Sequence, residues 1–90
     1  MMKLYVGERR TLEFVVSDSR HEEFSISQAN YKITLGDDLV DSGVMVIKDK
    51  TLSCVFAPTR KGSHRITVQY TIGLDTMIDM YYVEVSDDNL

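Results

Sequence analysis

The sequence lacks several features that mark particular classes of small protein. Its one cysteine, Cys54, cannot form an intrachain disulfide or a cysteine-based zinc site. It has no tryptophan and a net charge of −4, whereas nucleic-acid-binding proteins usually present a basic face. Nowhere do about 18 apolar residues follow one another to cross a membrane. We therefore expect neither a nucleic-acid partner nor a membrane partner.

The composition indicates one β-rich domain. Alanine occurs twice and proline once, whereas valine, isoleucine, threonine and tyrosine, which favour strands, are frequent. A chain of 90 residues holds a single core, so we predict one domain over residues 1–90, with 86–90 as a frayed polar tail. The apolar run at 1–6 is too short for a signal peptide, so we expect synthesis in the cytoplasm without one.

The clearest strand pattern covers residues 65–72, where apolar and polar side chains alternate as in a strand with one buried face. The apolar positions are Ile66, Val68, Tyr70 and Ile72. Because the short turn Gly73-Leu74-Asp75 follows, we predict that residues 77–85 fold back as an antiparallel partner. The resulting long hairpin is the expected scaffold of the domain.

Further segments with strand periodicity lie at 3–6, 11–17, 30–35 and 51–57. Residues 39–47 are interrupted by Asp41-Ser42-Gly43, which predicts a bend or bulge instead of one straight strand, and we expect the chain to cross between the sheets here. About seven strands are thus separated by turn signals at intervals of about ten residues, a pattern typical of an antiparallel β-sandwich with two sheets. The residues predicted to face its core are Leu12, Phe14, Val16, Tyr31, Ile33, Leu35, Leu52, Cys54 and Phe56.

The segment that precedes residues 65–72 resembles the turn into strand F of immunoglobulin-like domains, which carry the signature Asp-x-Gly-x-Tyr-x-Cys. Gly62 matches this signature, while Arg60 stands at the aspartate, His64 at the tyrosine and Ile66 at the cysteine. The resemblance implies an all-β, immunoglobulin-like antiparallel β-sandwich. It does not imply the disulfide or the tyrosine corner of antibody-type domains, because the residues that form them are absent.

The layout of the whole chain is similar to that of small immunoglobulin-like modules in bacteriophage tail and baseplate proteins, including the N-terminal domain of baseplate upper proteins. The shared features are an opening segment at 7–16, a middle segment at 36–46 and a closing strand pair through Tyr70 and residues 81–85. The resemblance implies a non-catalytic structural or interaction module of a phage or prophage virion. The alternative is a bacterial carbohydrate- or surface-binding module, against which the absence of tryptophan counts.

His64 and Cys54 are the first candidates for chemistry. His64 lies two residues before Ile66, so in a strand both side chains point to the same face. We therefore expect His64 to face the core and to bond backbone carbonyl groups as the corner tyrosine does. A free cysteine within a strand pattern, such as Cys54, is commonly a small buried apolar group. Catalysis would need His64, Cys54 and an acid together in one pocket, and a metal site would need His21 or a carboxylate beside His64.

Asp79 interrupts the apolar run 77–83. A buried carboxylate is costly unless it is paired, so we expect Asp79 at the rim, near the open end of the hairpin. Asp75 is too close along the turn to form a catalytic pair with it. Other acids offer oxygen ligands but follow no calcium-loop pattern: Asp37-Asp38 with Asp41, and Asp87-Asp88. We expect no catalytic residue, no metal and no cofactor.

The last strand is apolar on both faces. Tyr81, Val83 and Val85 share one face, and Ile78, Met80 and Tyr82 share the other. A two-layer sandwich buries only one face of each strand. Either loops cover the second face, or Ile78, Met80 and Tyr82 form a contact surface for another chain. The contact surface is the leading hypothesis for function, with a protein partner or a second copy of the chain as its occupant.

Overall fold

The computed structural model describes residues 2–17 and 23–87, which form eight strands and no helix. The strands are β1 (Met2–Tyr5), β2 (Arg10–Val15), β3 (Ile26–Leu35), β4 (Asp38–Val44), β5 (Val46–Lys48), β6 (Thr51–Phe56), β7 (Gly62–Ile72) and β8 (Asp75–Ser86). Among the described residues there is no helix with the length and apolar character needed to cross a membrane.

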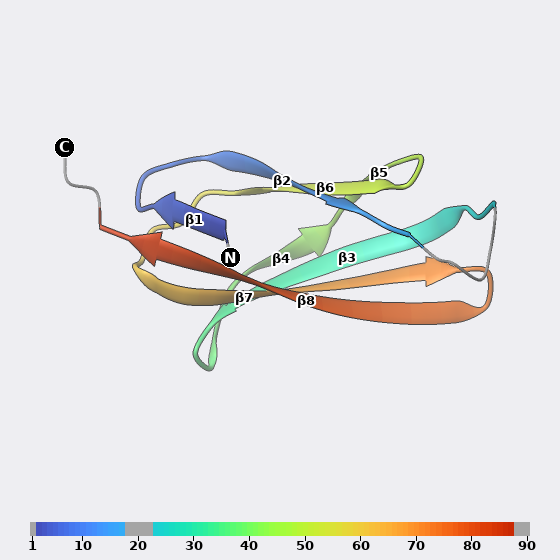
Figure 1. Cartoon of the computed structure of the whole chain (residues 1–90). Helices are drawn as coiled ribbons and strands as arrows, with labels where there is room; N and C mark the ends of the chain where they lie inside the picture. The colour runs from blue at the N-terminus through green and yellow to red at the C-terminus, as the bar shows by residue number, and fades with distance from the viewer. Residues whose placement is uncertain (1, 18–22, 88–90) are drawn as a thin grey trace.

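The strands form two sheets that face each other (Figure 1). One has the order β1-β8-β7-β3-β4 and the other the order β2-β6-β5. In immunoglobulin lettering, the second sheet corresponds to strands B, E and D, and β3, β4, β7 and β8 correspond to C, C′, F and G. The predicted immunoglobulin-like β-sandwich is therefore confirmed, with eight described strands instead of about seven. The described strand pairs are antiparallel except β1 with β8, which is parallel.

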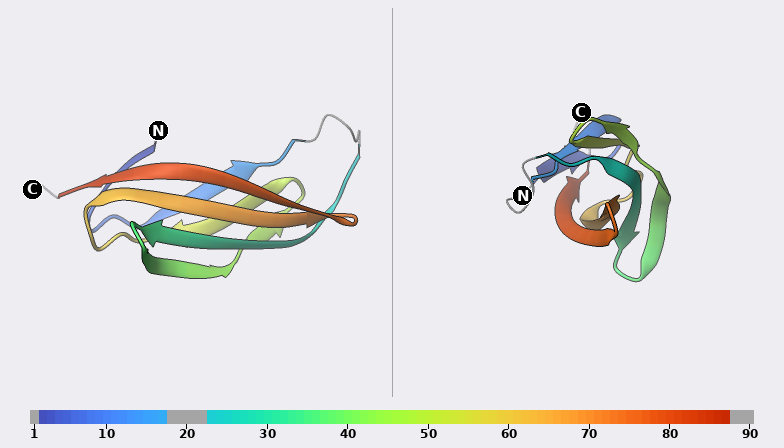
Figure 2. Two further views of the ribbon diagram at one scale, coloured as in Figure 1. Left: turned by 90° about the horizontal axis from the view of Figure 1, so that it is seen from below. Right: turned by 90° about the vertical axis from the view of Figure 1, so that its right-hand side faces the viewer.

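The core lies between the two sheets, and both sheets contribute to it. Ile33 and Ile66 from the first sheet and Leu52 from the second are fully buried. Burying an aliphatic side chain of this size contributes about 2 kcal/mol. The end-on view of Figure 2 shows the two layers curving around this core. The predicted inward positions are buried, except that Tyr31 and Leu35, at the side of the first sheet, are half-buried.

The run 39–47 is not one straight strand, as predicted: the register of β4 against β3 shifts between Leu39 and Asp41, and the chain crosses between the sheets at Met45, two residues after the predicted Asp41-Ser42-Gly43. β4 runs through these three residues in register with β3. An added Cβ at Gly43 would lie 3.3 Å from ring atoms of Tyr31, so glycine at this position lets the ring pack closely on β4. Met45 is buried, and its N–H donates a hydrogen bond to the Ala29 carbonyl (2.9 Å) before β5 begins in the other sheet.

The start of the predicted frayed tail belongs to the sheet. Ser86 is the last residue of β8, and its carbonyl accepts a hydrogen bond of 2.8 Å from the Val6 N–H. The next residue, Asp87, has a carboxylate oxygen 3.4 Å from the Lys61 ammonium. The rest of the tail, 88–90, lies outside the described residues, as does His21.

Candidate interaction surface

The outer face of β8 carries a row of exposed apolar side chains, which we call the β8 stripe. It consists of Ile78, Met80 and Tyr82, which are 57%, 56% and 49% exposed. The residues opposite them on β7 are polar: Gln69, Thr67 and Arg65. The stripe is thus one strand wide. The sequence left open whether loops cover this face or leave it exposed. In the structure it is exposed, because the described part of the chain leaves the stripe uncovered.

One side of β8 is a free backbone edge over residues 75–82. β1 pairs with β8 only from Val83 to Ser86, and no other described strand lies on that side. Because the Ser86 carbonyl accepts the Val6 N–H, Ser86 directs its backbone polar groups away from β7. This direction alternates along a strand. The residues that direct their N–H and C=O groups to the free edge are therefore Thr76, Ile78 and Met80; Tyr82 points the same way, but the parallel ladder that begins at Met2 and Val83 brings the Met2 N–H to its carbonyl.

The inner side of this edge is half-buried. Tyr81 packs on Phe14 of β2 with ring centroids 4.6 Å apart, and this contact joins the two sheets. The Tyr70 hydroxyl donates a hydrogen bond of 3.0 Å to the Asp79 carboxylate. Burial and, secondarily, the charge of Asp79 raise the pKa of Tyr81.

The prediction that Asp79 lies near the open end of the hairpin is wrong. Asp79 pairs with Val68 in the middle of the hairpin, where the hydrogen bond from the Tyr70 hydroxyl partly compensates the desolvation of the carboxylate.

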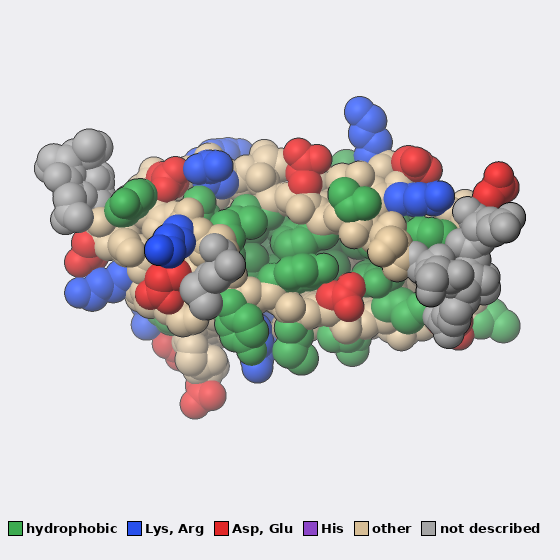
Figure 3. All heavy atoms as spheres, viewed as in Figure 1, with side chains coloured by type: hydrophobic (Ala, Val, Ile, Leu, Met, Phe, Trp, Pro, Cys, Tyr) green, Lys and Arg blue, Asp and Glu red, His purple; other side chains and the backbone are tan. Residues whose placement is uncertain are grey.

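Figure 3 shows the side of the molecule on which the free edge lies. Hydrophobic side chains gather in a hollow between β2 and β8, and others line the border beside β8. The unpaired backbone of β8 is therefore flanked by apolar side chains on its inner and outer sides.

His64 and Cys54 occupy structural positions. His64 is fully buried, as its parity predicts; its Nδ1 lies 3.1 Å from the Gly62 carbonyl oxygen, and its ring meets Phe56 edge-on at 5.4 Å between centroids. Its Nε2 has no hydrogen-bond partner among the described residues. Cys54 is buried, and this burial, with a smaller effect of the Asp41 charge, raises the pKa of the thiol to about 11. The thiol is protonated at neutral pH, so the nucleophilic thiolate is disfavoured.

The acidic residues of β4 have protein partners. A carboxylate oxygen of Asp38 lies 3.3 Å from a guanidinium nitrogen of Arg60. Asp41 accepts hydrogen bonds from the Tyr31 hydroxyl (3.1 Å) and the Ser42 N–H (2.9 Å). Across residues 2–17 and 23–87, no group of three or more His, Cys, Asp or Glu side chains could hold a metal ion.

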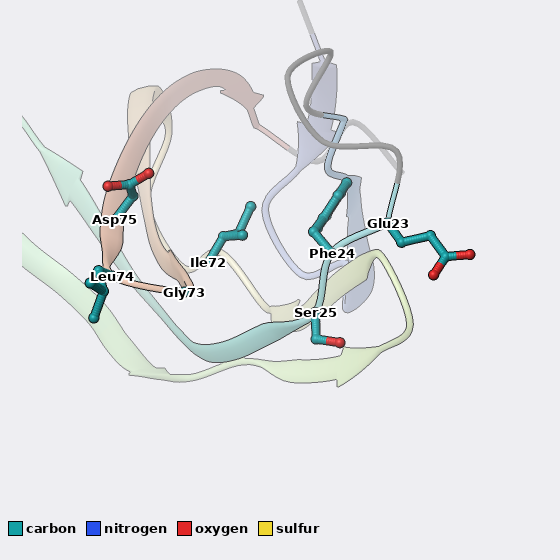
Figure 4. A pocket seen from close by; sticks show the side chains of 7 residues that line it. All are labelled: Glu23, Phe24, Ser25, Ile72, Gly73, Leu74 and Asp75. Atoms are coloured by element: carbon teal, nitrogen blue, oxygen red, sulfur yellow. The ribbon is translucent and has the colours of Figure 1, made fainter.

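A further hollow lies at the tip of the β7–β8 hairpin (Figure 4). Phe24 and Ile72 extend toward the interior of the sandwich, while Glu23 and Leu74 point outward. The Lys50 ammonium lies 4.9 Å from the centroid of the Phe24 ring. The hollow has an apolar floor on which polar groups do not converge, so it offers no arrangement for catalysis.

Solved structures that are similar to this chain share its fold. No protein-family model matches the sequence, and no curated protein matches it. An engineered protein is similar with a TM-score of 0.73 and 14% identity, over 93% of this chain and 18% of its own. A "putative glycoside hydrolase" from Bacteroides vulgatus is similar with a TM-score of 0.59 and 17% identity, over 94% of this chain and 16% of its own. This chain therefore spans less than a fifth of either neighbour.

The free edge of β8 is the feature that side-chain patterns do not reveal. It consists of backbone groups, which every residue carries. A signal was nevertheless present: the predicted first strand at 3–6 is much shorter than the predicted last strand at 77–85, so it cannot cover the whole length of that strand.

Proposed function

We propose that this chain is a non-catalytic structural or interaction module that binds another protein through the β8 stripe. The supporting observation is an uninterrupted apolar row that lies about half exposed beside a free backbone edge. Apolar side chains in that position gain little from folding but much from a partner that removes them from water. Tyrosine and methionine are also enriched in protein interfaces.

The proposed setting is a phage or prophage tail or baseplate. Its support is the similarity of the sequence layout to the immunoglobulin-like modules of such particles. Mass spectrometry of particles purified after prophage induction in the source strain is the test. The chain should copurify with tail proteins, and its absence from the particles would contradict this setting while leaving the interaction surface to be tested separately.

The non-catalytic part of the proposal is supported by the two candidate residues themselves. The buried Cys54 thiol is protonated at neutral pH, and the described contacts of His64 are with the Gly62 carbonyl and the Phe56 ring. A nucleophile and base would instead need to be within hydrogen-bonding reach of each other.

Met80→Lys tests the interaction surface. Lysine at this outer position should change the free energy of unfolding by less than about 0.5 kcal/mol, because more than half of the Met80 surface is exposed. It should weaken partner binding at least about tenfold, because a charge would be buried in the contact. Wild-type chain and the variant are immobilised, and the proteins they capture are compared.

Val55→Lys is the matched control, because Val55 is also an exposed apolar residue but lies on the outer face of the other sheet. It should capture the same partner as wild type. If Met80→Lys captures that partner equally well, the β8 stripe is not the binding surface. If the variant is unfolded by circular dichroism, the stripe is instead part of the core.

A shallow hollow on the outer face of the first sheet favours a second candidate, a carbohydrate- or surface-binding module. It is lined by Thr34, Gly36, Ser63, Arg65 and Tyr82, which offer an aromatic ring with hydroxyl and guanidinium groups around it. A glycan array tests this candidate. Arg65→Gln should abolish any glycan signal while protein capture through the β8 stripe persists; an array without a signal for wild type rejects the candidate.

A further inference from the structure

We propose that the free edge of β8 binds an extended segment of another protein that carries one lysine or arginine among apolar residues, with the basic side chain opposite Asp79. This inference rests on the proposed function, because it names the chemistry of the partner of the β8 stripe. The segment adds a strand beside residues 76–81, so that its backbone hydrogen bonds and its apolar side chains serve the same contact.

β8 is the least protected edge among the described strands. Proteins discourage edge pairing with irregular register, short strands and charged side chains. β4 has a register irregularity against β3 and β5 has three residues, while β2 presents Arg10 and Glu13. β8 pairs with β7 from Asp75 to Val85 without a shift, so its free part is regular.

The same edge already carries one strand. β1 lies on β8 from Val83 to Ser86, and its inward side chain Leu4 is 2% exposed. β1 also places Lys3 opposite Glu84. The covered part of the edge is thus paired with a strand that combines apolar residues with a cation opposite an acid.

The open part of the edge has room for a short segment. Thr76, Ile78 and Met80 direct their N–H and C=O groups away from β7, so they offer three donors and three acceptors. The Tyr82 carbonyl already meets the Met2 N–H. An added strand of about six residues therefore ends before β1 and does not displace it.

Asp79 decides the charge of the segment. It is the one charged residue within 76–81, and the Tyr70 hydroxyl donates a hydrogen bond to its carboxylate on the inner side of the sheet. No lysine or arginine of the described residues forms an ion pair with it. An inward charge at a strand edge discourages partners that do not neutralise it. Asp79 therefore favours a strand with a cation opposite.

Side-chain alternation defines the other positions. Residues opposite Ile78 and Met80 point to the outer face and extend the β8 stripe. Residues opposite Met77 and Tyr81 point inward, toward the hydrophobic hollow between β2 and β8 (Figure 3). The segment is therefore apolar, apolar, basic, apolar, apolar. This pattern reads the same in both directions, so it holds for parallel and antiparallel addition.

Two labelled peptides test the charge. One has the sequence Thr-Val-Ile-Lys-Val-Tyr-Thr, and the other has glutamate in place of lysine. Fluorescence anisotropy should show that wild-type chain binds the lysine peptide at least about tenfold more tightly, because glutamate would place like charges opposite each other.

Asp79→Asn should reduce this preference for lysine to within about threefold, because the carboxamide keeps an oxygen for the Tyr70 hydrogen bond but has no charge. Glu13→Gln is the matched control. It removes an exposed acid from β2, the edge of the other sheet, and should leave the preference unchanged.

Met80→Pro tests the backbone contact. The Met80 N–H points to the free edge, so proline there leaves the β7–β8 ladder intact but removes a donor and places its ring in the path of the added strand. The dissociation constant of the lysine peptide should rise at least about tenfold, whereas Met80→Val, which keeps the N–H, should stay within about threefold.

Methylated peptides give the same test without a protein variant. Alternate residues of an added strand direct their N–H groups to β8. N-methylation of one alternate set of residues in the lysine peptide should therefore abolish binding to wild-type chain. Methylation of the complementary set should leave the dissociation constant within about threefold.

Each outcome decides between the two proposals. A lysine peptide that does not bind wild-type chain at about 1 mM overturns strand addition, while the capture experiment with Met80→Lys still judges the proposed function. A preference for lysine that is absent, or that survives Asp79→Asn, overturns the assigned cation. Binding that tolerates both methylated sets but not Met80→Lys shows contact with the outer face, which overturns edge addition and supports the β8 stripe. A wild-type dimer in light scattering that excludes the peptide shows a second copy on the edge and overturns the proposed occupant.

Discussion

Cys54 lies on the inner face of β6, where it makes stability depend on alkaline pH. Burial raises the pKa of its thiol from 9.0 in the unfolded chain to about 11. The folded state therefore holds the proton more tightly, and this contribution is complete below pH 9 and is lost as pH rises through about 11. The free energy of unfolding should fall by about 2 kcal/mol from this group between these pH values.

Cys54→Ala isolates the effect of the thiol, because the tyrosines whose pKa is also raised, Tyr31 and Tyr81, are present in both proteins. The variant should be less stable at pH 8 because it leaves a small cavity. This difference should shrink as pH approaches 11, as measured by urea unfolding at a series of pH values. A difference that stays constant with pH would contradict the assignment.

Residue parity predicts which way a side chain points but not what it meets. His64 faces the core as its spacing from Ile66 requires, and Asp79 shares the face of Tyr81. The hydrogen bond from Tyr70 to Asp79 was not predictable, because it joins diagonal positions of the hairpin: Tyr70 pairs with Met77, and Asp79 with Val68. Such a contact depends on register and side-chain length together.

At the scale of elements, the alternating strands were predictable, and the crossover was predicted in the right run of residues, 39–47, but two residues too early. The periodicity of 11–17, 51–57 and 65–72 places their inward residues in the core as found. The bulge predicted at Asp41-Ser42-Gly43 lies just before it, between Leu39 and Asp41, while Gly43 itself makes room for the Tyr31 ring. Sequence pattern does not separate these two uses of glycine, because both leave a gap in the apolar alternation.

Gly62→Ala should show how much the start of β7 depends on glycine. Gly62 has φ +130°, a conformation that side chains rarely adopt, and an added Cβ would lie 2.8 Å from a methyl group of Leu35. We expect a loss of about 2 to 3 kcal/mol in the free energy of unfolding. Gly73→Ala is the comparison: its φ is +60° and no heavy atom lies within 4 Å, so about 1 kcal/mol should be lost. Equal losses in urea unfolding would show that the steric contact and φ at Gly62 do not matter.

At the scale of the molecule, the sandwich was predictable because strand count and turn spacing limit a chain of this size to few architectures. The strand order was not predictable, because the pairing of strands that are distant in the sequence is decided only by how the chain folds in three dimensions. The parallel pairing of β1 with β8 illustrates this, because it joins the two ends of the described chain. The same pairing stops at Val83, so the apolar row of β8 could be predicted from the sequence but the free backbone edge beside it could not.

The two sheets share one core, so they should unfold together even when only one is altered. All five tyrosines of the sequence lie in the first sheet, and there is no tryptophan, so tyrosine fluorescence reports on that sheet alone. Leu52 lies in the second sheet and is fully buried. Leu52→Ala should lower the free energy of unfolding by about 2 to 5 kcal/mol through lost burial and the cavity left behind.

The loss of unfolding free energy caused by Leu52→Ala should be the same whether unfolding is followed by tyrosine fluorescence or by far-ultraviolet circular dichroism, which averages over both sheets. Val55→Ala is the control from the same strand; its side chain is on the outer face, so the change should be about 0.5 kcal/mol or less. If Leu52→Ala moved the dichroism curve but left the tyrosine curve in place, the first sheet would be stable without the second. The five-stranded sheet bearing the β8 stripe would then be an independent unit.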